Sequence, residues 1–378
     1  MNNMINFDNS ATSFPKPRSV RNAVDAAVAR YGGNPGRSGH ALSLLAAQKV
    51  FEVRELAAEM FGAETENVAF THNSTYALNM AIKGIMQYGG HIIISSLEHN
   101  SVARPVYALS KTRGVTFSVA RVYEDDARTL EEIESLINAK TKCICCMAAS
   151  NVTGKVLPYK EIAALCKRKG LCFICDCSQA AGVMELSLSD GFDFICTSGH
   201  KSLYAPTGTG LLITNGEYPL STIIEGGTGA TSASLEQTGF MPEKLESGTL
   251  NTVGIIGLGE GLRFVRAKGI KNIFAHENAL CTRFIERLSQ REDIKIYRDS
   301  GSFLPIVSFN IGKMSSQITA AKLSDKGFAL RGGLHCAPLA HNTLGTVGQG
   351  TVRFSPSVFN NLSQTERLCD VIMQIKPE

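Results

Sequence analysis

The feature that most constrains the fold is a regular alternation of two kinds of segment between about residues 45 and 215. Amphipathic stretches with the period of a helix alternate with short, unbroken apolar runs. The predicted helices cover 46–61, 75–86, 130–137 and 160–169, and the predicted strands cover 68–71, 91–95, 142–148, 171–175, 192–197 and 211–213. Strands without polar alternation are typical of a mostly parallel sheet covered by helices on both faces. We therefore expect an α/β protein, with a helix over 251–268 and a second α+β region after it.

Length and charge narrow the class of protein. A chain of 378 residues suits one large domain and a smaller one. The net charge of +4 gives no reason to expect a nucleic-acid or membrane-surface partner. The first residues lack the basic and apolar regions of a secretory signal, and no apolar run is long enough to span a membrane. We expect a cytoplasmic protein.

The eleven cysteines raise the alternative of a metal or redox site. Cys172 and Cys175 form a CxxC, but they lie in a predicted strand, where residues three apart point to opposite faces. A chain of this length needs no disulfide framework, and so many thiols indicate a reducing compartment. We expect buried core thiols and no metal. Cys336, in a glycine-rich segment, is the exception.

Polar side chains follow five of the predicted strands. They are Ser74 and Thr75, His99, Asn151, Asp176 with Gln179, and Ser198 with His200 and Lys201. Ligands of open α/β sheets bind at the carboxyl ends of the strands, so these groups are expected to converge. Hydroxyls at a helix start suit a phosphate, a carboxylate can keep a pyridine nitrogen protonated, and a lysine can form an imine. Each residue alone also has an ordinary structural interpretation, as a helix cap, a turn residue or a surface charge.

The segment Ser198-Gly199-His200-Lys201, together with Asp176-Cys177-Ser178-Gln179, resembles the aminotransferase class V family of fold-type I pyridoxal phosphate (PLP) enzymes. The resemblance covers nearly the whole chain, because Asn9-Ser10-Ala11-Thr12 and the segment from Arg331 to Ala337 also match. The second of these, Arg331-Gly332-Gly333-Leu334-His335-Cys336-Ala337, resembles the Arg-x-Gly-x-His-Cys-Ala loop of cysteine desulfurases and selenocysteine lyases.

The resemblance implies a role for each matching residue. Lys201 would form the Schiff base with PLP, Asp176 would pair with the ring nitrogen, Gln179 would bond the phenolic oxygen and His99 would stack on the ring. Asn151 would contact the cofactor or the substrate, and Ser74, Thr75, Ser198 and His200 would hold the phosphate. Arg353 would grip the substrate carboxylate, with Arg331 and His40 (in Arg37-Ser38-Gly39-His40) also near the substrate. Cys336, Lys201 and His99 would be the catalytic residues.

The resemblance also implies how the chain is organised. A large PLP-binding domain would cover residues 15–250, and residues 1–14 with 251–378 would form a small domain that carries the cysteine loop and the substrate arginine. Thr249, in a Gly-Thr-x-Asn segment, would reach the phosphate of a neighbouring subunit. The protein would then be a homodimer with shared sites.

The implied activity is that of a PLP-dependent cysteine desulfurase. Lys201 would take the Cα proton of L-cysteine, and the Cys336 thiolate would attack the substrate sulfur, leaving a persulfide and releasing L-alanine. A sulfur-acceptor protein, for example in iron–sulfur cluster assembly, would be the partner. Selenocysteine lyase or another class V reaction is the alternative, because Asn100, Ser202 and Leu334 depart from the common desulfurase pattern. A PLP-binding protein without catalysis would need neither Arg353 nor Cys336.

Overall fold

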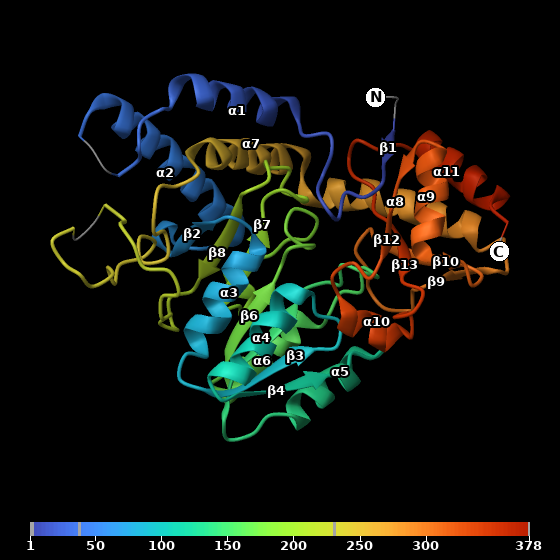
Figure 1. The fold of residues 1–378 in the computed structure, drawn as a ribbon, viewed down its shortest axis with the longest axis horizontal. Helices are drawn as coiled ribbons and strands as arrows, with labels where there is room; N and C mark the ends of the chain where they lie inside the picture. Colours follow the sequence, from blue (N-terminus) through green and yellow to red (C-terminus); the bar gives the residue numbers. More distant parts are fainter. Residues whose placement is uncertain (1–3, 37–38, 230–231, 377–378) are drawn as a thin grey trace.

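The structure, a computed structural model, describes residues 4–36, 39–229 and 232–376. The helices are α1 (Arg18–Arg30), α2 (Ala41–Phe61), α3 (Ser74–Ile85), α4 (Asn100–Thr112), α5 (Asp126–Ser135), α6 (Tyr159–Lys169), α7 (Thr252–Lys268), α8 (Ile270–Leu288), α9 (Ser316–Asp325), α10 (Pro338–Leu344) and α11 (Leu362–Gln374). The strands are β1 (Ile5–Asn6), β2 (Val68–Thr71), β3 (Gly90–Ser95), β4 (Val115–Ala120), β5 (Thr141–Met147), β6 (Cys172–Asp176), β7 (Phe194–Ser198), β8 (Gly210–Thr214), β9 (Ile294–Ile296), β10 (Val307–Ile311), β11 (Phe328–Ala329), β12 (Arg331–Gly333) and β13 (Thr351–Phe354). Figure 1 shows a larger body around the long sheet and a smaller one formed mostly by the C-terminal part of the chain.

The larger body is built on a seven-stranded sheet in the order β2-β8-β7-β6-β5-β3-β4. β8 runs antiparallel to both of its neighbours, and the other neighbouring strands are parallel. The predicted α/β fold with a mostly parallel seven-stranded sheet is therefore confirmed. Because β2, β3, β5, β6 and β7 share one direction, their carboxyl ends lie at the same edge of the sheet.

Helices cover both faces of this sheet. One face packs against α3 and α4, through side chains such as Leu78 and Val106. The opposite face packs against α2, α5, α6 and α7, where Val53, Ile162 and Leu258 belong to one continuous apolar cluster. Burial on both sides explains why the central strands contain almost no polar alternation in their sequences.

The smaller body is built on the antiparallel sheet β12-β13-β10-β9. Its apolar cluster joins this sheet to α8, α9 and α11. The segment that contains β1 and Phe7 belongs here, because β1 pairs with β11 and the Phe7 ring lies 4.7 Å from that of Phe354. α7, in contrast, packs against α1 and α2 of the larger body. The division into domains at residues 14 and 250 stays a prediction.

The cysteines are placed as the strand geometry predicted. Ten of the eleven are buried and unpaired, and Cys336 is exposed. Cys172 lies in the cluster on one face of the sheet and Cys175 in the cluster on the other, so the CxxC cannot chelate one ion. Among the described residues, no group of three or more His, Cys, Asp or Glu side chains could hold a metal. None of the helices in the described ranges is long and apolar enough to cross a membrane.

Candidate active site

A cavity of about 280 Å³ opens at the carboxyl ends of β5, β6 and β7. Eleven of the predicted site residues line it: Ser74, Thr75, His99, Asn151, Asp176, Gln179, Ser198, His200, Lys201, Arg331 and Arg353. Ser10, Ala11, Asn73, Ser101, Met147, Ala149, Ser178 and His335 complete the wall. The expected convergence of polar side chains from five strands is therefore present in one hollow.

Lys201 follows β7 and is the primary amine of the cavity wall. Burial lowers the pKa of Lys201 to about 8, Asp176 acts in the opposite direction, and the cations Arg353 and Arg331 lower it further. A substantial fraction of the Lys201 amine is therefore neutral near physiological pH. A neutral amine is the form that attacks a carbonyl carbon.

Asp176, the last residue of β6, is held by hydrogen bonds to one of its two carboxylate oxygens. Oδ1 accepts from the Ser178 backbone N–H at 2.9 Å, from Ser178 Oγ at 2.5 Å and from Ser74 Oγ at 3.4 Å. Among the described residues, no hydrogen bond to Oδ2 accompanies these. Oδ2 of this fixed carboxylate is thus the atom left to accept a hydrogen bond from a ligand in the cavity.

The N-terminus of α3 forms a further part of the wall. Asn73 caps the helix by accepting from the Tyr76 N–H, and the Ser74 N–H donates to Ser198 Oγ at 3.0 Å. A Cβ on Gly210 would lie 2.7 Å from Asn73 Cα, so glycine allows β8 and the helix start to approach closely. Hydroxyls and helix N–H groups from two elements are thereby gathered where an anion is favoured.

His99 is held as a neutral ring. Its Nδ1 accepts from the Ser101 N–H at 3.0 Å as the N-cap of α4, so the ring proton is on Nε2. Burial lowers the pKa of His99 to about 4, and Asp176 opposes this shift. Ser101 Oγ lies 2.7 Å from both His99 Nδ1 and Thr75 Oγ1, which links the histidine to the start of α3.

Four buried polar atoms of cavity residues lack hydrogen-bond partners among the described residues: His200 Nδ1, Asn151 Oδ1, His335 Nδ1 and Arg353 Nε. Burial lowers the pKa of His200 to about 4, so its ring is neutral. An unsatisfied buried polar atom costs free energy unless a ligand or water completes it. PLP needs a set of hydrogen-bond donors and acceptors around it. In this cavity that set comprises His200 Nδ1, Asn151 Oδ1, the start of α3, the Lys201 amine and Asp176 Oδ2.

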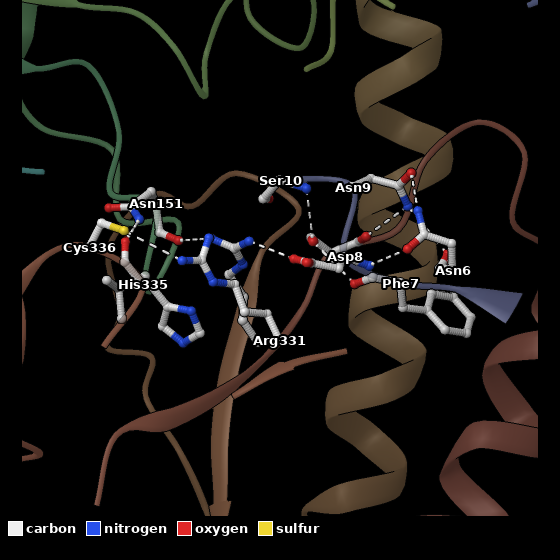
Figure 2. A network of polar contacts seen from close by, with 12 residues as sticks. Asn6, Phe7, Asp8, Asn9, Ser10, Asn151, Arg331, His335 and Cys336 are labelled. Atoms are coloured by element: carbon white, nitrogen blue, oxygen red, sulfur yellow. Dashed lines mark hydrogen bonds and ion pairs between the residues drawn. The ribbon is translucent and has the colours of Figure 1, made fainter. Parts of the chain in front are cut away.

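Cys336 lies beside the cavity in the loop after β12. His335 and Cys336 adopt left-handed backbone angles, with φ of 50° and 57°, which cost energy in residues other than glycine. Asn151 Nδ2 donates to the His335 carbonyl and the Asn100 N–H to the Cys336 carbonyl, each at 2.8 Å. Arg331 Nη2 donates to Cys336 Sγ at 3.4 Å, as Figure 2 shows. The loop therefore presents an exposed thiol next to a cation.

Two predicted site residues lie away from the cavity. Thr249 is exposed and accepts from Asn34 Nδ2 at 3.3 Å in a separate hollow beside Gly208. His40 is an exposed N-cap of α2 whose Nδ1 accepts from the Ser43 N–H. Arg37 and Ser38 of the same motif lie outside the described residues. A single chain does not bring Thr249 or His40 to the cavity.

The sequence reasoning missed four polar residues in or behind the wall: Asp8, Ser10, Ser101 and Ser178. Ser178 and Ser10 stand inside motifs that were recognised for their neighbours, so their motifs were the available signal. Ser101 lies two residues after His99, in the first turn of the helix that His99 caps, and this spacing was the available signal. Asp8 had no local signal, because its partner Arg353 lies 345 residues further along the chain.

The comparisons with known proteins agree with this geometry. The family model for aminotransferase class V matches residues 5–368. A probable cysteine desulfurase of Pyrococcus abyssi is 32% identical, covering 98% of this chain and 94% of the relative. The apo structure of a cysteine desulfurase from Thermococcus onnurineus superposes with a TM-score of 0.90 at 30% identity, covering 98% and 94% of the two chains. An Escherichia coli cysteine desulfurase, with a TM-score of 0.89, 24% identity and the same coverage of each chain, supports the fold alone. The chain belongs to the aminotransferase class V family.

Proposed function

We propose that this protein is a PLP-dependent cysteine desulfurase, which converts L-cysteine to L-alanine and keeps the sulfur as a persulfide on Cys336. The observation that carries the proposal is the position of Cys336 Sγ, exposed and 3.4 Å from Arg331 Nη2 at a cavity that also contains Lys201 and Asp176. The similarity to probable cysteine desulfurases over 98% of the chain supports the same reaction.

PLP, when bound, would supply an electron sink for the carbon next to the amino group of the substrate. Lys201 would hold it covalently, Asp176 would accept from its ring nitrogen, and His99 would lie against its ring. Gln179 would face its phenolic oxygen. Ser74, Thr75, Ser198 and His200, at the start of α3 and the end of β7, would hold its phosphate.

Lys201 is suited to move a proton at the substrate Cα. Since its pKa is about 8, Nζ can take a proton and give it back near neutral pH. Asp176 and the cations Arg331 and Arg353 influence this amine in opposite directions. Arg353 would bind the carboxylate of L-cysteine, as a guanidinium fork does, and Asn151 would contact the substrate.

Cys336 is proposed as the sulfur nucleophile. Its thiolate would form an S–S bond to the substrate sulfur, and the C–S bond of the substrate would break, so that L-alanine leaves after protonation. The reaction needs no external oxidant, because the electron pair of the broken C–S bond stays with the substrate Cβ and takes up a proton there, so that the carbon is reduced as the sulfur is oxidised to the persulfide level. Arg331 would stabilise the negative sulfur through its hydrogen bond.

The site is proposed to be completed in a homodimer. Thr249 and His40 are exposed and lie outside the cavity of their own chain, so a second copy would bring Thr249 to the neighbour's phosphate. A sulfur-acceptor protein would receive the persulfide at the exposed Cys336. Ten unpaired buried thiols agree with a cytoplasmic, reducing compartment.

The decisive experiment replaces Cys336 by Ser. The variant is expected to bind PLP with an unchanged visible spectrum and to lose L-cysteine desulfuration by about a hundredfold or more, because the nucleophile is absent. In wild-type protein exposed to L-cysteine without reductant, the peptide bearing Cys336 should gain the mass of one sulfur atom, whereas the peptide bearing the buried Cys369 should not.

Alanine release by Cys336→Ser at the wild-type rate would overturn the proposal. L-selenocysteine should be tested beside L-cysteine, since selenium can leave without thiolate attack. If Cys336→Ser retains activity on L-selenocysteine and also acts on L-cysteine at the wild-type rate, the result would indicate a selenocysteine lyase or another class V reaction.

A further inference from the structure

Arg353, on β13, is nearly inaccessible to solvent, with 1% exposure, and its guanidinium is already held at two ends. Nη1 donates to the Asn151 carbonyl at 2.9 Å, and Nη2 donates to Asp8 Oδ1 at 2.7 Å. Nε has no hydrogen-bond partner in the described part of the chain. A guanidinium has five N–H groups, so these two bonds leave enough donors for a bidentate carboxylate.

Asp8 is itself fixed by the N-terminal segment. It forms a parallel bridge with Ser355, two residues beyond Arg353, and its N–H donates to Asn6 Oδ1 at 3.1 Å. Asn9 Nδ2 donates to the Ser355 carbonyl at 3.0 Å. Figure 2 shows Asp8 on one side of the network, with Arg331 nearer the middle and Cys336 on the other side. The carboxylate of Asp8 therefore occupies a defined place beside β13.

The Asp8 carboxylate balances the positive charge of Arg353, which is buried next to other cations. Burial lowers the pKa of Arg353, and Asp8 opposes the shift by its charge and its hydrogen bond, whereas the neighbouring Arg331 adds to it. Arg331 and Lys201 share the cavity with Arg353. Without Asp8, the guanidinium would be a buried cation among cations, and Nη2 would lose its acceptor.

We propose that Asp8 is a positioning residue: it fixes the Arg353 guanidinium so that its remaining N–H groups face the α-carboxylate of the substrate. The inference rests on the proposed function, in which Arg353 binds that carboxylate. Asp8 does not touch the substrate. It selects α-amino acids over amines without a carboxylate, because the cost of orienting the guanidinium is met before the substrate arrives.

The test compares Asp8→Ala with Asp8→Asn in the PLP-loaded enzyme. Asp8→Ala should raise the KM for L-cysteine about tenfold, because a charge-assisted hydrogen bond is lost, with little change in kcat. The inhibition constant of cysteamine, which lacks the carboxylate, should stay unchanged. Asp8→Asn should restore most of the affinity for L-cysteine, since an amide oxygen still accepts from Nη2.

Ile5→Ala is the matched control. Ile5 lies in the same segment, its side chain packs against the apolar cluster of the smaller body, and its N–H donates to the Gly327 carbonyl, a bond that alanine keeps. The Ile5 side chain has no polar atom that could bond Asp8 or Arg353, so the KM of this variant should stay within about twofold of wild type. A wild-type KM for Asp8→Ala, or an equal loss of cysteamine affinity, would overturn the inference. Failure of the proposed function is distinguishable, because wild-type protein would then form neither L-alanine nor the Cys336 persulfide.

Discussion

At the scale of single residues, the Lys201 amine carries a pH dependence that can be measured without substrate. Its pKa is about 8, lowered from 10.5 mainly by burial. Below this value Nζ is protonated and cannot attack the aldehyde of PLP, and above it the amine is neutral. The rate at which the apoprotein captures PLP should therefore rise between pH 7 and 9 with a midpoint near 8.

The measurement is the growth of visible absorbance after PLP is mixed with apoprotein at a series of pH values. An ordinary exposed lysine would show a midpoint near 10.4 instead, and that result would contradict the burial argument. Lys201→Ala should develop no covalent cofactor absorbance at any pH. Retention of the band in this variant would place the Schiff base on another lysine.

At the scale of secondary-structure elements, a buried ion pair connects α2 to the segment that precedes Thr249. Arg54 of α2 donates to both oxygens of Glu246, at 2.7 and 2.8 Å, and to the Val68 carbonyl. The Phe70 N–H of β2 donates to Glu246 Oε1 at 2.7 Å. Both charged side chains are at least 92% buried, so neither is well solvated without the other.

Arg54→Ala should lower the free energy of unfolding by about 3–5 kcal/mol, because it leaves Glu246 buried without a partner. The double variant Arg54→Met with Glu246→Leu should lose much less, since both buried charges are removed together. Urea unfolding of the wild type and the variants measures both effects. A loss below about 1 kcal/mol for Arg54→Ala would show that the pair behaves like a surface ion pair.

The elements best predicted from the sequence are those with a regular pattern of burial, such as a strand buried along most of its length or a helix with one buried face. The strand 68–71 has the bounds of β2, and the predicted helix 160–169 begins one residue after α6 does. β4 was missed because it is an edge strand with four partly or fully exposed residues between Val115 and Ala120. α4 was missed because it contains Pro105, which normally interrupts a helix.

The candidate site likewise contains residues that could be predicted from the sequence and residues that could not. Lys201, Asp176 and Ser74 could be placed from the sequence because each lies at or just after the carboxyl end of one of the strands that share a direction in the large sheet, and that topology directs them to one edge. Asp8 could not be placed, since the pairing of β1 with β11 depends on tertiary packing. The position of His40 outside the cavity could likewise not be predicted by motif matching, whereas the same resemblance already assigned Thr249 to the site of a neighbouring subunit.

At the scale of the whole molecule, exposed apolar side chains on α2 indicate where a second copy would bind. Leu44 and Phe51, seven residues apart and therefore on the same face of the helix, are each more than half exposed, and Phe51 borders a hollow of about 630 Å³. Large exposed apolar patches mark interaction sites. Sedimentation of the wild-type protein should therefore show a homodimer.

Phe51→Asp should shift the protein toward monomer and weaken PLP retention, because a charge would replace an apolar contact and Thr249 would no longer reach the neighbour's site. Val28→Asp, at an exposed apolar position on α1, is the matched control and should remain dimeric. A wild-type monomer that retains PLP tightly would contradict the shared-site proposal.

The contact between Asp8 and Arg353 joins positions 345 residues apart, and this separation has a consequence during synthesis. Translation produces Asp8 before the strands of the large sheet and Arg353 only after that whole sheet has been made. A nascent chain on the ribosome could thus form the strands that carry Lys201 and Asp176 before it has Arg353, the residue proposed to bind the substrate carboxylate. Under the proposed function, cysteine breakdown would then begin only after β13 has emerged and lies beside the N-terminal segment.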